Sequence, residues 1–214
     1  MSRRTAMSQL SPSASEQWGM VTAGQARRLG VSRVDLNRLI DDEILETIDN
    51  APRVYRLTGA PADPDLDGLR AAWLQLGGSK TWEERIVNPD AVVSHRSAAH
   101  ARGLGDLIPS AHEFYVPFRR RPRRDDVHLR VRTHLAPETW SMWSGLPVCT
   151  IETIVSDLLQ DREDESAVAQ IVRDAMRDGL LDEAGLQRAT HGHARRYGHA
   201  KDSDLMATLN GAQV

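Results

Sequence analysis

Two arginines and an asparagine are spaced so that, on a helix, their side chains could hydrogen-bond to the edges of DNA bases. A helix that begins after Ser32 and runs to about Asp41 would place Arg33, Asn37 and Arg38 on the side opposite Leu36 and Leu39. Arginine and asparagine are the side chains that form paired hydrogen bonds with guanine and adenine, respectively. Just before this helix, the residue at position 32 is a serine, whose hydroxyl or backbone N–H could contact a phosphate. The sequence therefore predicts a DNA contact by Ser32, Arg33, Asn37 and Arg38.

Helix start and stop signals around these residues predict two short helices. Thr22 is a suitable N-cap for a helix over residues 23–29, and Gly30 can end that helix in a left-handed conformation. Ser32 is a second N-cap, for a helix that runs to about Asp41. A helix, a tight turn and a second helix form the layout of a helix-turn-helix.

Two alternating segments follow, as expected for a β-hairpin. Residues 44–48 and 53–57 alternate between apolar and polar positions, and residues 49–52 between them are typical of a turn. A hairpin directly after the second helix would be a wing. Arg53, at its tip, would then reach a phosphate or the minor groove.

Composition changes divide the chain into three parts and predict an α+β protein. Residues 1–15 are polar and are expected to form a flexible arm, and residues 16–60 form the winged helix-turn-helix. A linker rich in Pro and Asp follows Ala60. Residues 65–214 then alternate helical and strand patterns, which predicts a mixed α+β domain.

Five arginines lie close together between two predicted strands, in a segment broken by Pro122. An exposed loop of this kind could contact a polyanion or an acidic partner, or it could be a solvated hairpin tip. The five arginines are Arg119, Arg120, Arg121, Arg123 and Arg124.

The charge is unevenly distributed along the chain, although the formal net charge is −3. Residues 95–133 hold nine Arg against four acidic residues, whereas residues 151–189 hold four Arg against ten. Residues 1–58 are only weakly basic, with eight Arg against seven acidic residues. We therefore expect DNA binding to need help from elsewhere in the chain or from a homodimer on DNA.

Several other kinds of chemistry find no support in the sequence. The histidines at positions 191, 193 and 199 lie near one another, but no paired cysteine or His-Glu-x-x-His motif accompanies them, so no metal or cofactor is predicted. Phosphate-binding loops and nucleophile elbows are absent, so no catalytic residues are predicted and the protein is not expected to be an enzyme.

Cys149 is expected to be a small core residue. The chain shows no membrane span or secretion signal, and we expect a cytoplasmic protein.

Larger motifs resemble one known family. They are Trp18–Arg33 and Arg53–Leu57 in the N-terminal part, then Val93–Pro109 with its Ser-His-Arg-Ser-Ala-Ala-His run, and Gly145–Leu158. Together with Arg196-Tyr-Gly they resemble the AbiEi-type antitoxins of type IV toxin–antitoxin systems, over about residues 16–200.

This resemblance implies a transcriptional autorepressor that is also an antitoxin. Such a protein would bind inverted repeats in its own promoter through the winged helix, using Ser32, Arg33, Asn37, Arg38 and Arg53. Its second domain would counteract a nucleotidyltransferase-like toxin, directly or indirectly. Two alternatives remain open: a winged-helix regulator with a dimerising or ligand-sensing second domain, and a toxin-modifying phosphotransferase that uses Asp106 or Asp157 with a divalent ion.

Overall fold

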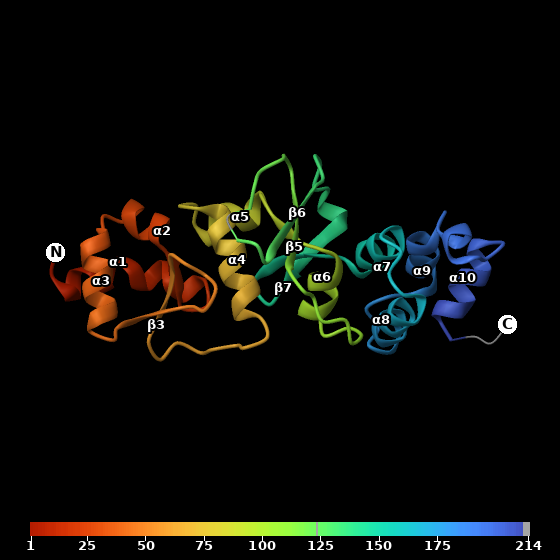
Figure 1. Ribbon diagram of the computed structural model, residues 1–214, viewed down its shortest axis with the longest axis horizontal. Coiled ribbons are helices and arrows are strands. Elements are labelled where there is room, and N and C mark those ends of the chain that lie inside the picture. Colours follow the sequence, from red (N-terminus) through yellow and green to blue (C-terminus); the bar gives the residue numbers. More distant parts are fainter. Residues whose placement is uncertain (123, 212–214) are drawn as a thin grey trace. The chain divides into compact units, whose positions relative to one another are not determined.

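The computed structural model describes residues 1–122 and 124–211, and its architecture is α+β. The chain divides into two compact units, unit 1 (Met1–Ala91) and unit 2 (Val92–Val214), which are described separately. Figure 1 shows their helices and strands in chain order. Across the described residues, every helix falls short of the length and apolar character that a bilayer-crossing segment requires.

Unit 1 combines five helices of the described chain with a small antiparallel sheet. Its strands pair in the order β1-β3-β2, with Val21 opposite Tyr55 and Thr47 also opposite Tyr55. The elements are α1 (Arg3–Glu16), β1 (Met20–Thr22), α2 (Ala23–Arg28), α3 (Arg33–Asp41), β2 (Leu45–Thr47), β3 (Val54–Leu57), α4 (Asp67–Gly77) and α5 (Trp82–Val87). The two predicted helices and the predicted hairpin are therefore present.

The prediction of a flexible arm over residues 1–15 was wrong, because this segment forms α1. Ala6, Leu10 and Ala14 recur every four residues and are buried against the apolar core of unit 1. Two of these three side chains are alanines, and Pro12 lies within the helix, so the apolar stripe is narrow and the segment looks polar. Tertiary packing, rather than intrinsic propensity, holds the helix in place.

The predicted domain boundary at residues 60–65 also differs from the structure. These residues do form a connection, but α4 beyond them packs back on β1 and β3. The Trp18 and Trp73 rings meet edge to face with their centroids 6.3 Å apart, and Arg56 forms an ion pair with Asp67. The boundary between the units therefore falls after Ala91.

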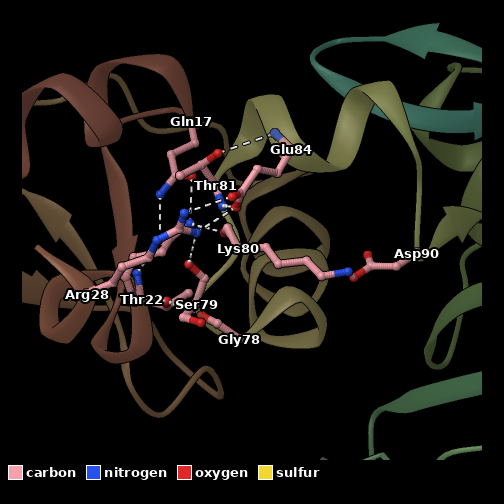
Figure 2. Close-up of polar contacts among 10 residues, drawn as sticks. Gln17, Thr22, Arg28, Gly78, Ser79, Lys80, Thr81, Glu84 and Asp90 are labelled. Atoms are coloured by element: carbon pink, nitrogen blue, oxygen red, sulfur yellow. Dashed lines mark hydrogen bonds and ion pairs between the residues drawn. The ribbon is translucent and has the colours of Figure 1, made fainter.

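A polar network fastens α2 to the turn between α4 and α5 (Figure 2). The Gln25 side chain donates to the Lys80 carbonyl at 2.8 Å, and the Thr22 hydroxyl donates to the Gly78 carbonyl at 2.7 Å. Gly24 permits this approach, since a Cβ atom there would lie 2.6 Å from the Gly78 oxygen. Arg28 adds a paired contact to Glu84 at 2.7 and 2.8 Å. Residues beyond the linker thus hold α2, the first of the two predicted helices, in place.

Unit 2 contains a mixed five-stranded sheet in the order β6-β5-β4-β8-β7, covered by helices. Helix α6 packs on β5, β8 and α7, and the helices from α7 to α10 pack on one another. The strands are β4 (Val92–Val93), β5 (His112–Val116), β6 (Val127–Val131), β7 (Trp140–Trp143) and β8 (Leu146–Cys149). The helices are α6 (His95–Ala101), η1 (Pro137–Thr139), α7 (Ile151–Gln160), α8 (Glu165–Arg177), α9 (Glu183–Thr190), η2 (Ala194–Tyr197) and α10 (Asp202–Leu209).

The arginine-rich segment between β5 and β6 does not form a hairpin tip. The two strands are parallel neighbours, with Phe114 opposite Leu129, so a tight hairpin turn cannot join them. Alternation indicated both strands correctly but gives no strand direction. Cys149 is buried in β8, as predicted for a core residue, and its burial raises the pKa of the thiol.

Candidate nucleic-acid interface

Helix α3 presents one side to the core of unit 1 and the other to solvent. Leu36 and Leu39 are buried, which fixes the rotation of the helix about its axis. Arg33, Asn37 and Arg38 are exposed. The side chains predicted to read DNA bases are therefore accessible, on a helix whose opposite side is held in the core by Leu36 and Leu39.

The exposed side of α3 has free capacity to donate hydrogen bonds. In the part of the chain that the structure describes, Arg33 has no ion-pair partner, and Arg38 lies 3.6 Å from the Asp35 carboxylate. A contact of that length at the surface contributes little and would not prevent the Arg38 guanidinium from binding another group. The face is thus suited to donating to acceptor groups, as DNA base edges require.

Ser32 begins α3, as predicted, but its hydroxyl is already engaged. The oxygen accepts from the Asp35 N–H at 3.1 Å, and the hydroxyl donates to the Asp35 carboxylate at 2.5 Å. That hydrogen bond from Ser32 lowers the pKa of Asp35, which keeps the carboxylate ionised at the positive end of the helix. A phosphate contact at Ser32 would therefore fall to the backbone N–H.

Arg53 lies in the connection just before β3 and is exposed. Its backbone has a positive φ of 68°, and its carbonyl accepts from the Ala23 N–H at 2.9 Å. This hydrogen bond ties the connection to the start of α2. The backbone at Arg53 is thus held in a conformation that is uncommon for a residue other than glycine.

Val34 was not among the predicted site residues, although it shares the exposed side of α3. Its side chain is 59% exposed. Positions 34, 37 and 38 have the i, i+3, i+4 spacing of helix neighbours, and this spacing was the available signal. The face therefore combines donors with one apolar group.

The arginine-rich segment of unit 2 is less uniform than predicted. Arg119 and Arg121 are exposed, and the Arg120 guanidinium lies 5.8 Å from the centre of the Phe118 ring. Arg124 is buried and forms a two-pronged ion pair with Asp126, so it does not belong to an exposed basic surface. Arg123 lies outside the described residues.

The histidines near the C-terminus contact separate partners. His191 approaches Asp202 at 3.4 Å, and His199 approaches Glu165 at 2.7 Å. Among the described residues, no three His, Cys, Asp or Glu side chains form a group suited to a metal ion.

The two carboxylates considered for phosphotransfer have different surroundings. Asp106 is exposed, whereas Asp157 is 7% exposed and lies 3.6 Å from Arg132. Burial raises the pKa of Asp157 to about 6, against the opposing influence of a hydrogen bond with Tyr115 and of the Arg132 charge.

This pKa shift predicts a pH-dependent stability that depends on Asp157. Because the folded pKa is raised, its contribution is complete below pH 3.8 and is lost as the pH rises through about 6. Asparagine does not titrate, so Asp157→Asn should not lose this stability. We therefore expect the free energy of unfolding of Asp157→Asn, relative to that of the wild type, to increase by about 3 kcal/mol as the pH rises from 4 to 7. Urea unfolding of both proteins at several pH values measures this difference. The lowered pKa of His95 gives the opposite pH dependence of stability, but it is present in both proteins and cancels in the comparison. A difference in unfolding free energy that does not change with pH would contradict the prediction.

Comparison with known proteins supports the fold. No protein-family model matches the chain, and no curated protein matches it. Among solved structures, it is similar to the crystal structure of the RV2827C protein from Mycobacterium tuberculosis, with a TM-score of 0.50 and 17% sequence identity. The alignment covers 98% of this chain and 83% of that one. At this identity the likeness shows a shared fold, and function must be argued from the chemistry of the site.

Proposed function

We propose that the protein is a sequence-specific DNA-binding repressor and that residues 16–60 act as a winged helix-turn-helix. The observation on which this proposal rests is the exposed side of α3, where Arg33, Asn37 and Arg38 are accessible while Leu36 and Leu39 are buried. A helix anchored in this way can enter the major groove without disturbing its own core.

The connections on either side of α3 support this proposal. Between α2 and α3, Gly30 has a φ of 81°, and the Val31 N–H donates to the Ala26 carbonyl at 2.8 Å, which gives a short, well-defined turn. After α3, the β2–β3 hairpin leads to exposed Arg53. In the proposed arrangement α3 reads bases and Arg53 contacts the phosphate backbone.

The test is a fluorescence-anisotropy titration of the full-length protein on the DNA upstream of its own gene. We expect saturable binding that resists excess unrelated duplex and weakens as salt increases, because phosphate contacts release counterions. Equal affinity for the upstream DNA and for shuffled DNA of the same composition would exclude sequence-specific repression.

Val34 allows a finer test of base recognition. An exposed valine between base-reading side chains is suited to contact the methyl group of a thymine. We expect replacement of thymine by deoxyuridine at one or more operator positions to weaken binding about fourfold, since this change removes only that methyl group. At those positions, Val34→Ala should bind the thymine-containing and the deoxyuridine-containing operator equally well. If every thymine tolerates replacement in the wild type, Val34 does not read a methyl group.

We also propose that the same protein is the antitoxin of a toxin–antitoxin pair, with unit 2 counteracting a nucleotidyltransferase-like toxin. The support is the resemblance to AbiEi-type antitoxins. Its stronger motif, Val93–Pro109, and the motif that supports it, Gly145–Leu158, each include residues from one of two strands that are parallel neighbours. Val93 of β4 lies opposite Val148 of β8, and α6 packs on α7. Residues far apart in sequence thus form one continuous region of unit 2.

Co-expression tests the antitoxin proposal. A nucleotidyltransferase-like protein encoded beside this gene should arrest growth when expressed alone, and unit 2 should be required for rescue. A full-length protein with Arg33 and Arg38 replaced by alanine should still rescue growth from a constitutive promoter, which separates neutralisation from repression. Failure of the wild-type protein to rescue growth would contradict the antitoxin role.

A further inference from the structure

Unit 2 contains a surface cavity of about 350 Å³ whose lining is mostly polar and charged. It lies where the start of α6, the strands β5 and β6, and the end of α7 meet. The lining includes three carboxylates, those of Glu113, Asp161 and Glu163. It also includes the basic side chains of His95, Arg96, His128, Arg130 and Arg162. None of them belongs to the proposed DNA-reading surface.

The sheet face at this cavity departs from the usual pattern of a covered sheet. Glu113 of β5 is opposite His128 of β6, and Tyr115 is opposite Arg130, so these four side chains share one face. A face covered by helices normally presents apolar side chains, because buried charges are expensive unless they are paired. Such departures from the local rule are expected at functional sites.

The carboxylates of the cavity have little capacity left for a ligand. Both Glu113 oxygens accept hydrogen bonds, at 3.0 Å from the Arg96 N–H and at 3.4 Å from Arg130. Both Asp161 oxygens contact Arg130, and the Glu163 oxygens accept from Arg96 and from the Asp164 N–H. All six oxygens of these three carboxylates are therefore engaged.

The donors of the cavity, in contrast, retain free capacity. Among the described residues, no side chain is a partner of exposed Arg162. The Arg130 Nε is buried and has no hydrogen-bond partner among the described residues. Arg96 uses its Nε for Glu163 while its side chain stays 42% exposed. What the cavity lacks is therefore an acceptor.

Two residues that line the cavity have strained backbones. His95 has a φ of 51° and Arg162 a φ of 58°, and neither is a glycine. Arg162 directly follows Asp161, the C-cap of α7, at a position where helices usually place glycine. A residue other than glycine keeps such a conformation only where the surrounding structure holds it there.

We propose that this cavity binds an oxyanion, namely a phosphate group that is either free or the monoester of a nucleotide. Arg162 provides the unpaired guanidinium, and Arg96 and Arg130 provide further N–H donors beside carboxylates that are already neutralised. Planar guanidinium groups are well matched to phosphate oxygens, with which they form paired, charge-assisted hydrogen bonds. The inference does not depend on DNA binding by unit 1.

The first test is calorimetric titration of the full-length protein with inorganic phosphate and, separately, with adenosine monophosphate. We expect saturable binding that Arg162→Ala weakens about 10-fold to 100-fold, the range for loss of a charged hydrogen-bond donor. Arg195→Ala, at another exposed arginine of unit 2, is the control of equal charge and should bind as the wild type does.

The two ligands distinguish the source of the phosphate group. Tighter binding of the nucleotide assigns the cavity to a phosphate monoester, whereas equal affinities assign it to the phosphate group alone. No saturable binding of either ligand, or equal weakening by Arg162→Ala and Arg195→Ala, would overturn the proposal.

Arg162→Gly separates a binding role from a structural one. Glycine adopts a positive φ without strain, so this variant should raise the Tm by roughly 3–5 °C while losing phosphate affinity as Arg162→Ala does. A lower Tm would mean that the Arg162 side chain stabilises the fold, and it would contradict a free donor at this position.

Discussion

Replacing Arg33 and Arg38 together with alanine is expected to abolish sequence-specific DNA binding while leaving the protein folded. Each arginine that donates two hydrogen bonds to a guanine provides about 1–3 kcal/mol of discrimination. The pair should therefore weaken specific binding by about 2–6 kcal/mol, on the order of 30-fold to 10,000-fold. Both side chains are exposed and alanine favours helix, so stability should change little.

The measurement is the anisotropy titration of the double variant on operator and on shuffled DNA. Arg4→Ala with Arg195→Ala removes the same charge from exposed positions outside α3 and should retain the preference for operator DNA. A loss of affinity that is equal for both double variants would mean that net charge alone governs binding.

Arg53→Ala should produce a different effect from the α3 variants. A phosphate contact is independent of sequence, so its loss should weaken binding to operator and shuffled DNA alike and reduce the slope of log affinity against log salt by about 1. If Arg53→Ala changed the preferred sequence instead, the proposed division between base-reading and phosphate-contacting residues would be wrong.

Local signals in the sequence were sufficient for the elements around this site. Ser32 accepts from the Asp35 N–H at the start of α3, and Thr22 caps α2 in the same way, both as their types predicted. The turn at Gly30 and the hairpin ending in β3 are likewise present. These features depend on contacts within a few residues, so they can be read from a short window of sequence.

Features that depend on distant contacts could not be predicted in this way. The stretch after Ala60 is a connection, as its composition indicated, but nothing in it reveals that Trp73 returns to Trp18. The oxyanion cavity joins α6, β5, β6 and the end of α7, which no spacing along the chain brings together. One local signal was available: Arg162 occupies a position after a helix where glycine would be expected.

Helix α4 belongs to the core of unit 1, and its Trp73 should be essential for the stability of that unit. Trp73 is fully buried, its indole N–H donates to the Ala91 carbonyl at 2.9 Å, and the Arg85 guanidinium lies 3.5 Å from its ring centre. We expect Trp73→Ala to lower the free energy of unfolding by about 3–5 kcal/mol, since it leaves a large cavity beneath a buried arginine. Val87→Ala, at a side chain that is 84% exposed, should have almost no effect.

Truncation tests the same packing without any substitution. A fragment of residues 1–91 should show a cooperative thermal transition by circular dichroism and dispersed amide resonances. A fragment of residues 1–64 should show neither, because it loses the α4 side chains that cover β1 and β3 and leaves Gln25 and Thr22 without the Lys80 and Gly78 carbonyls. Cooperative unfolding of the shorter fragment at the same temperature would mean that the proposed DNA-binding segment folds by itself. The linker after Ala60 would then be the true domain boundary, and α4 with α5 would be an independent addition to it.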